Sequence, residues 1–155
     1  MIIRKAENKD IEGILKLLLQ VNQVHADGRP DLFKNGGIKY THEALEEKFT
    51  RTNETVFVAV EEDEVRGYSF LEIVETKENT SLYPHTSLYI DDLCIDEKYR
   101  KHNIGCMLFE EIKKYAAELK VYNITLRVWE CNPGAMKFYE KMGMKPLYTE
   151  MEMFY

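Results

Sequence analysis

The strongest constraint on the fold of this chain is an amphipathic helical segment that separates two extended runs. Apolar side chains recur every three or four residues from Ile104 to Leu119, which predicts a helix ending near residue 120. Extended runs at 86–95 and 123–129 flank it, and the second alternates apolar and polar side chains from Ile124 to Trp129. We therefore expect two neighbouring parallel strands joined by a right-handed crossover.

Extended runs also precede this crossover. β-branched and aromatic residues at 55–61 and 65–75, separated by the acidic turn Glu62-Asp63-Glu64, predict an antiparallel meander that continues into 86–95. A strand at 147–154, which again alternates apolar and polar side chains, is predicted to close the chain.

Helix signals occupy the remaining segments. Asn8 as N-cap predicts a helix over 8–25, and Thr41 as N-cap predicts a shorter helix with Leu45 and Phe49 on its buried side. Asn132, Pro133 and Gly143 bracket a last helix over 133–142. The order β-α-α-β-β-β-α-β-α-β is an α/β fold with a mixed sheet. No linker or repeat divides it, so we expect one domain over residues 1–155.

Charge and cysteine content narrow the function. The chain has 21 Lys and Arg against 27 Asp and Glu, a net charge of −6, which argues against nucleic-acid binding and favours a cationic substrate. Cys94, Cys106 and Cys131 show no metal-ligand spacing, so we expect reduced core thiols and no metal site. No run is apolar enough for a signal peptide or membrane span, which predicts a cytoplasmic protein that does not bind membranes.

One cationic segment stands out in this acidic chain. Lys98 to Cys106 joins a buried strand to a helix start, where free backbone N–H groups and the helix dipole favour an anion. With Arg100 and Lys101 nearby, the segment predicts a pocket for a pyrophosphate, and Gly105 allows close backbone approach. The alternative is a solvated loop whose charges bind nothing.

Three segments together resemble a known family. Leu93-Cys94-Ile95, then Arg100-x-x-Asn103-Ile104-Gly105, then Asn132 followed by Phe138-Tyr139-Glu140-Lys141-Met142-Gly143, are similar to the GNAT superfamily of acetyl-CoA-dependent N-acetyltransferases. The resemblance covers residues 88–145 and implies the GNAT acyl-CoA N-acyltransferase fold. In the family loop Q/R-x-x-G-x-G/A, Asn103 replaces the first glycine, and asparagine tolerates a left-handed backbone.

The resemblance implies where acetyl-CoA would bind. The strand before the basic loop splays from its parallel neighbour, and its free backbone groups pair with the pantetheine arm like an added strand. The implied cofactor-binding residues are Leu93, Cys94, Ile95, Arg100, Lys101, His102, Asn103, Ile104, Gly105, Cys106, Asn132 and Tyr139.

The resemblance also implies catalytic roles. Tyr139 matches the family's general acid, which protonates the departing thiolate, although without the motif the residue reads as a core aromatic. An acceptor amine needs a base, and Asp91 of the pair Asp91-Asp92 is the first candidate. Adjacent strand residues face opposite sides, so only one of the pair is expected to face the substrate. Glu72 is the competing base, and the alternative for Asp92 or Glu72 is an ion pair with Arg127.

The loop after the first helix is the expected acceptor site. His25, Arg29, Asp31 and Phe33 combine charge and aromatic surface there, although the same loop also reads as a helix stop. The Trp129 face and the apolar last strand are expected either to bury each other or to form a homodimer contact.

The function expected from these observations is direct transfer of an acetyl group from acetyl-CoA to a primary amine, with a small cationic amine favoured. Two alternatives stay open: acetylation of a protein lysine or N-terminus, and a non-catalytic acyl-CoA-binding sensor domain.

Overall fold

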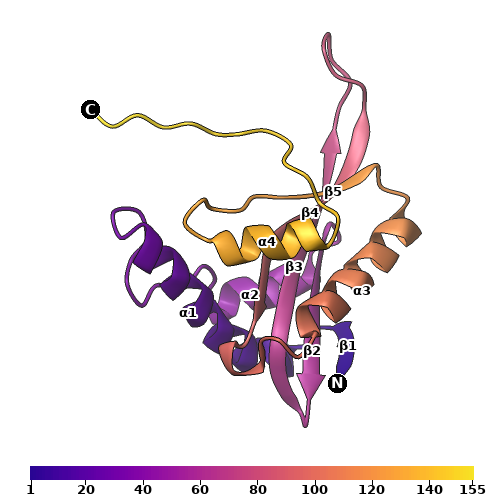
Figure 1. Ribbon diagram of the computed structural model, residues 1–155. Helices are drawn as coiled ribbons and strands as arrows, with labels where there is room; N and C mark the ends of the chain where they lie inside the picture. Colours follow the sequence, from indigo (N-terminus) through magenta and orange to yellow (C-terminus); the bar gives the residue numbers. More distant parts are fainter.

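A five-stranded mixed sheet forms the centre of the computed structural model, which describes residues 1–155 (Figure 1). The strands lie in the order of the chain: β1 (Ile2–Lys5), β2 (Glu54–Glu61), β3 (Glu64–Thr76), β4 (His85–Ile95) and β5 (Asn123–Leu126). The first three pairings are antiparallel, and β4 and β5 are parallel. The predicted meander and the predicted parallel crossover are therefore confirmed.

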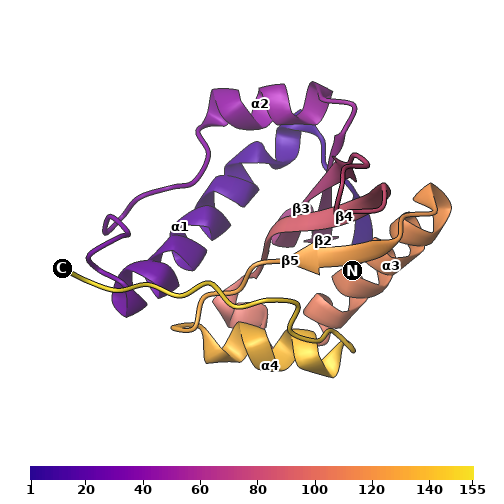
Figure 2. The same cartoon turned by 90° about the horizontal axis from the view of Figure 1, so that it is seen from above.

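Helices cover both faces of the sheet (Figure 2). On one face lie α1 (Ile11–Gly28), which follows the 3₁₀ turn η1 (Asn8–Asp10), and α2 (His42–Thr50). On the other face lie α3 (Ile104–Leu119), preceded by η2 (Glu97–Tyr99), and α4 (Pro133–Lys141). The sheet thus separates an α1/α2 face from an α3/α4 face.

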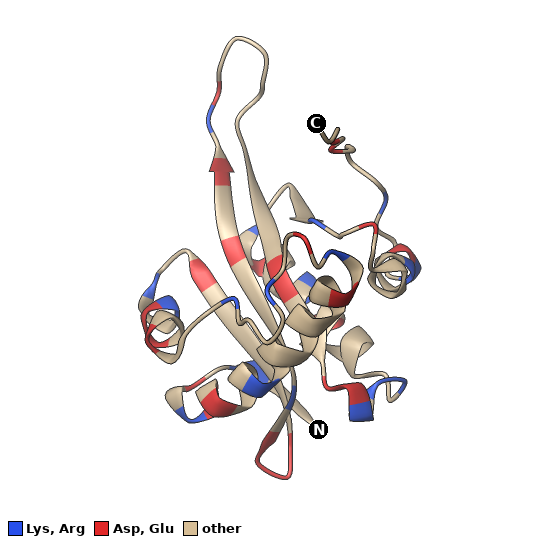
Figure 3. Cartoon of the chain, turned by 90° about the vertical axis from the view of Figure 1, so that its left-hand side faces the viewer, with Lys and Arg blue, Asp and Glu red and all other residues tan.

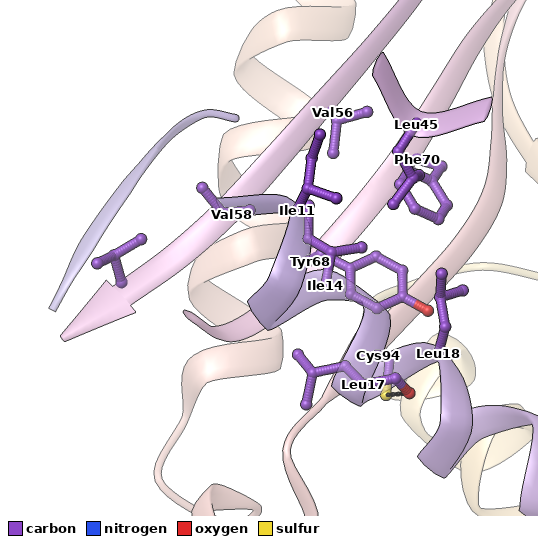
Figure 4. Packing of buried hydrophobic residues seen from close by; sticks show 11 residues of the cluster. Ile11, Ile14, Leu17, Leu18, Leu45, Val56, Val58, Tyr68, Phe70 and Cys94 are labelled. Atoms are coloured by element: carbon purple, nitrogen blue, oxygen red, sulfur yellow. Dashed lines mark hydrogen bonds between the residues drawn. The ribbon is translucent and has the colours of Figure 1, made fainter. Parts of the chain in front are cut away.

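Two apolar cores, one on each face, hold these layers together. The core on the α1/α2 face contains Ile14, Leu18, Tyr68 and Phe70, all with no exposed surface (Figure 4). The core on the α3/α4 face is built on Leu88, Ile90, Leu108 and Ile112, with Phe138 and Tyr139 of α4 packed against it. Alternate residues of β3 and β4 supply the two cores, which is the period-two pattern of a strand covered on both faces.

Local signals account for most element boundaries. The Thr41 hydroxyl accepts a hydrogen bond from the Ala44 N–H at 3.2 Å, and Asn132 Oδ1 accepts one from the Ala135 N–H at 3.2 Å, as N-caps do. The predicted cap at Asn8 is wrong by one residue. Glu7 caps the 3₁₀ turn η1, and its backbone N–H donates to Asp10 Oδ2 at 2.8 Å in a capping box, while α1 begins after Asp10.

The end of the chain departs from the predicted strands. β5 stops at Leu126, three residues before the predicted end, because the chain there leaves the sheet toward α4. The predicted strand at 147–154 is absent. Residues 145–155 form an extended tail with no ladder partner, and Leu147, Met151 and Met153 are 73%, 85% and 81% exposed (Figure 1). Alternation gives a segment one apolar and one polar face, but the segment forms a strand only if the edge of another strand pairs with it.

Candidate functional site

The parallel pair β4 and β5 separates halfway along β4. Pairing runs from Ser87–Asn123 to Ile90–Leu126 and ends there, while β4 continues to Ile95. On its other edge β4 stays paired with β3, as in the pair Gly67–Ile95. One edge of residues 91–95 therefore has no strand partner, and its backbone groups are available to an extended ligand. This is the splay that the family resemblance implied.

The basic loop lies at the end of this open edge. The Asn103 backbone is left-handed (φ 65°), as predicted for the residue that replaces the loop glycine, and Lys101 is left-handed too (φ 69°). The side chain of Asn103 does not cap α3, so it leaves the first N–H groups of the helix without a side-chain partner. Arg100 is exposed and anchored through its Nε, which donates to the Ile95 carbonyl at 3.3 Å.

Gly105 has a packing role that the sequence did not indicate. A Cβ at this position would lie 3.2 and 3.3 Å from two ring carbons of Phe138. Gly105 therefore lets α4 approach the first turn of α3, with the Phe138 ring against it. His102 Nδ1 lies 3.1 Å from the Tyr99 carbonyl, Ile104 is buried and Cys106 is partly exposed.

The cysteines are all free thiols. Cys94 is a buried core residue, as expected, and its Sγ donates weakly to the Leu17 carbonyl at 3.6 Å (Figure 4). Burial, with a smaller contribution from the Asp92 charge, raises the pKa of Cys94 to about 12. A thiol with that pKa is not a nucleophile at neutral pH.

Tyr139 stands on α4 with its ring against Phe138 and Phe109, at centroid distances of 5.2 and 6.3 Å. The structure gives its hydroxyl no hydrogen-bond partner in the protein. Burial first, then the charges of Asp92 and Cys94, raise the pKa of Tyr139 above its ordinary value. The phenol is therefore protonated at neutral pH and near enough to Asp92 to sense its charge.

A β-bulge in β4 changes the side of the sheet to which Asp91 and Asp92 point. Phe70 pairs with Asp92 and Leu71 with Ile90, so Asp91 is the extra residue of β4. Leu88 and Ile90 belong to the α3/α4 core, whereas Cys94 beyond the bulge belongs to the α1/α2 core. Asp91 and Asp92 therefore both face the α1/α2 side. The prediction that only one of them could do so was wrong, because it assumed an unbroken strand.

Asp91 is held by two residues that sequence reasoning missed. Tyr40 Oη donates to Asp91 Oδ2 at 2.5 Å, and Lys39 Nζ donates to Asp91 Oδ1 at 2.9 Å. Burial by itself would raise the pKa of Asp91, but the hydrogen bonds from Tyr40 and Lys39 outweigh it and leave that pKa below its ordinary value. Asp91 is an ionised anchor for an ammonium group, and a weak base.

Asp92 has the opposite character. Burial is the main reason that the pKa of Asp92 is raised, against the opposing effects of the Lys39 charge and of a hydrogen bond from Tyr68 Oη at 2.9 Å. No ion pair links Asp92 or Glu72 to Arg127, whose Nε instead donates to Tyr148 Oη at 3.4 Å. Glu72 pairs with Tyr89 across the strands and makes no side-chain hydrogen bond. Acidic residues therefore lie on the central strands of the sheet (Figure 3).

The predicted acceptor loop follows α1 and forms an aromatic group. The rings of His25 and Phe33 lie 4.9 Å apart, and Phe33 meets Trp129 edge-on at 5.1 Å. Burial, and secondarily the Lys39 charge, lowers the pKa of His25, which keeps the ring neutral at pH 7. Trp129 is thus covered on one side by this loop and not by the last strand.

Arg29 and Asp31 form a pair that binds the tail. Arg29 makes two hydrogen bonds to Asp31, at 2.9 and 2.8 Å, and its Nη1 donates to Glu152 at 2.6 Å. Its guanidinium also lies over the Phe154 ring, 5.7 Å from the centroid. The tail consequently passes beside the predicted acceptor loop.

Other features lie away from this site. A surface cleft of about 370 Å³ is lined by α3 from Phe109 onward, by β5 and by Met142 to Met144. No three His, Cys, Asp or Glu side chains converge as metal ligands would. None of the helices combines the length and apolarity that crossing a bilayer demands.

Comparison with known proteins identifies the family. Residues 21–144 match the family described as Acetyltransferase (GNAT) family. The chain is 32% identical to a mutant form of a Bacillus halodurans protein of known structure, with 99% of this chain and 98% of the other covered and a TM-score of 0.95.

More distant structures share the fold. The acetyltransferase from Vibrio fischeri is 21% identical, with 83% of this chain and 97% of that chain covered and a TM-score of 0.68. An aminoglycoside acetyltransferase from an uncultured soil metagenomic sample is 19% identical over 99% of this chain and 94% of that chain, with a TM-score of 0.73. The match to the family model and to the Bacillus halodurans protein, together with the splayed strands and the basic loop, shows that the chain belongs to the GNAT family of acetyltransferases.

Proposed function

We propose that this protein is an N-acetyltransferase that moves the acetyl group of acetyl-CoA to a primary amine by direct attack in a ternary complex. One observation carries the proposal: the open edge of residues 91–95 leads from an acidic pair at a bulge to the uncapped start of α3. A donor ligand with an amide-bearing arm and a pyrophosphate fits this arrangement. Its arm can pair with the open edge, and its pyrophosphate can lie at the helix start.

The residues present fit acetyl-CoA. The open edge at Leu93, Cys94 and Ile95 offers backbone groups for the pantetheine amides, and the loop from Arg100 to Cys106 offers N–H groups and positive charge for the pyrophosphate. The side-chain oxygen of Asn132 caps α4, and the NH₂ group of the same side chain is proposed to contact the coenzyme. The bound coenzyme supplies an activated thioester, and the protein supplies position and proton transfer.

The acceptor amine is proposed to enter on the α1/α2 face. An alkylammonium group of pKa about 10.4 would find three carboxylates there, namely Asp91, Asp92 and Glu72. The aromatic group of His25 and Phe33 lies at the end of the same face. A small cationic amine suits this environment, and a protein lysine or N-terminus is the alternative of the same chemical class.

Proton transfers divide between two residues in this proposal. Only the free amine attacks a thioester, so the ammonium must lose a proton, and Asp92 is proposed to accept it through water because its pKa is raised. Asp91, the base expected from the sequence, has a lowered pKa and is proposed to hold the ammonium instead. Tyr139 is proposed to donate its proton to the departing thiolate.

A second copy of the chain is proposed to cover the tail. The apolar side chains of residues 147–154 are solvent-exposed, and β5 forms the last edge of the sheet. Pairing of this segment with the β5 edge of another copy would give the predicted strand its partner. Sedimentation should show a dimer for the full chain and a monomer after truncation at Lys145.

Reduced thiols and acetyl-CoA use both suit the cytoplasm, where we propose that the enzyme acts.

An amine panel tests the proposed function. The protein is incubated with acetyl-CoA and with amines of increasing positive charge, and release of the coenzyme thiol is followed. Diamines should react faster than neutral or acidic amines. Tight binding of acetyl-CoA without turnover for any amine would favour the alternative of another class, a non-catalytic acyl-CoA sensor.

A further inference from the structure

Asp91 of the acidic pair already holds a primary ammonium group, and that group belongs to the protein. Lys39 Nζ lies 2.9 Å from Asp91 Oδ1 and 3.2 Å from the Asp91 carbonyl oxygen. Lys39 is on the connection between α1 and α2, and its side chain is 45% exposed, against 19% for Asp91. The Lys39 stem therefore reaches from solvent to the bulge, as an entering alkylamine would.

The charge of Lys39 also affects the pKa of Asp92, one of the residues proposed to transfer protons. Its charge opposes the burial that raises the pKa of Asp92, and the Asp92 charge in turn contributes to the raised pKa of Tyr139. Coulomb effects of this kind act over a few ångströms to about ten ångströms. The Lys39 charge thus acts on Asp92, and the Asp92 charge acts on Tyr139.

Resting on the proposed acetyl transfer, we propose that Lys39 is a self-acetylation site, at which the enzyme places one acetyl group on its own side chain. The chemistry is that of the acceptor reaction with the amine tethered to the protein. A tethered amine has a high effective concentration at the reacting centre, because its encounter with the donor is intramolecular.

The step balances without a further reactant. The Lys39 ammonium separates from Asp91 and gives one proton to water beside Asp92. The free nitrogen attacks the thioester carbonyl carbon, a C–N bond forms, the C–S bond breaks, and the nitrogen releases its second proton to solvent. Tyr139 gives its proton to the leaving sulfur and regains one from solvent. The products are an acetamide at Lys39 and coenzyme A with a free thiol, and no atom is oxidised or reduced.

Two other lysines show what distinguishes Lys39. Lys34 lies in the same connection, exposed and with no acidic partner, so it reports background acetylation of a solvated lysine. Lys48 is buried and paired with Glu54 at 2.5 Å, with side chains only 7% exposed on both sides, so it lacks access. Lys39 alone of these three combines solvent access with the acids at the bulge.

Acetylation would change the acceptor site. The acetamide carries no charge, so Asp91 would lose its lysine partner and become available to the ammonium of an external amine. The modification would therefore increase the affinity of the enzyme for cationic acceptors.

Peptide mass spectrometry tests the proposal on the full chain with acetyl-CoA and no added amine. Acetyl occupancy is followed at Lys39, Lys34 and Lys48. Lys39 should be acetylated at least about tenfold faster than Lys34, with a rate constant that does not change when the protein is diluted at fixed acetyl-CoA. Tyr139→Phe should slow modification of Lys39 and of an external amine by the same factor.

The outcomes separate this inference from the proposed function. If external amines are acetylated while Lys39 reacts no faster than Lys34, the inference is wrong and the proposed function stands. If neither an amine nor Lys39 is acetylated, both fall. A rate at Lys39 that rises with protein concentration would show transfer between molecules and overturn the intramolecular step.

A matched pair of variants tests the effect on the acceptor site. Lys39→Arg keeps the charge beside Asp91, and Lys39→Gln resembles the acetylated side chain. The inference predicts a severalfold lower KM for a diamine in Lys39→Gln than in Lys39→Arg, with similar kcat. Equal KM values would show that Lys39 does not compete with the acceptor for Asp91, which would overturn the inference.

Discussion

Removal of the Tyr139 hydroxyl separates its chemical role from its packing role. Tyr139→Phe keeps the ring contacts with Phe109 and Phe138. Because the structure gives the hydroxyl no protein partner, the substitution removes no internal hydrogen bond, and the free energy of unfolding should change by less than about 0.5 kcal/mol.

The expected effect on the rate follows from the proton balance. A thiolate has a pKa near 8.5 and an ordinary phenol near 10, so donation from phenol to thiolate is uphill by about 2 kcal/mol, and burial raises the pKa of Tyr139 further. The contribution should therefore lie at the low end for a positioned acid, about 10²-fold, which corresponds to about 2.7 kcal/mol of activation free energy.

Single-turnover quench measurements at saturating acetyl-CoA and amine report the chemical step, so slow product release cannot hide the loss. Tyr115→Phe is the matched control. Its hydroxyl lies 2.9 Å from Thr55 Oγ1, away from the site, so this variant should lose about 1 kcal/mol of stability and no activity. An unchanged single-turnover rate in Tyr139→Phe would refute the role of Tyr139 as proton donor.

Three further predictions concern the cofactor loop, the acids and the fold. Calorimetry should show that replacing Arg100 and Lys101 together with Ala weakens acetyl-CoA binding by about tenfold; unchanged affinity would exclude the loop. Asp92→Asn should lower kcat most at neutral pH and recover near pH 10, where free amine is abundant, whereas loss of ammonium binding alone would raise KM at every pH. The pKa of Asp10 is lowered because its hydrogen bonds, chiefly from Arg4, outweigh the opposing burial. Ionised Asp10 therefore stabilises the fold above its unfolded pKa, and that stability is lost as pH falls through its folded pKa. Urea unfolding should show Asp10→Asn less stable by about 2 kcal/mol at pH 7 and a difference that shrinks at acid pH; a pH-independent difference would contradict this.

Local patterns predicted much of the fold because they act within a few residues. The cap at Thr41, the cap at Asn132 and the left-handed backbone at Asn103 each depend on one side chain and its own turn. The crossover from β4 to β5 followed from the length of the helix between them.

The parts that sequence could not predict depend on contacts between distant segments. The bulge at Asp91 is set by the register of β4 against β3, which no local pattern in 86–95 encodes. Tyr40 meets Asp91 across 51 residues of sequence, so neither Lys39 nor Tyr40 had a local signal. The segment 147–154 has the alternation of a strand, but within a single chain no edge pairs with it.

The fate of labelled acetyl groups tests whether the acetyl group passes directly from the coenzyme to the amine. Lys39→Arg protein, which cannot be acetylated at that position, is mixed with isotope-labelled acetyl-CoA and the best amine of the panel, and products are quenched within one turnover. Direct transfer predicts label on the amine nitrogen, one free coenzyme thiol for each acetylated amine, and no labelled protein within that turnover. Label that appears on the protein before it reaches the amine, or coenzyme release without an acetylated amine, would contradict direct transfer in a ternary complex.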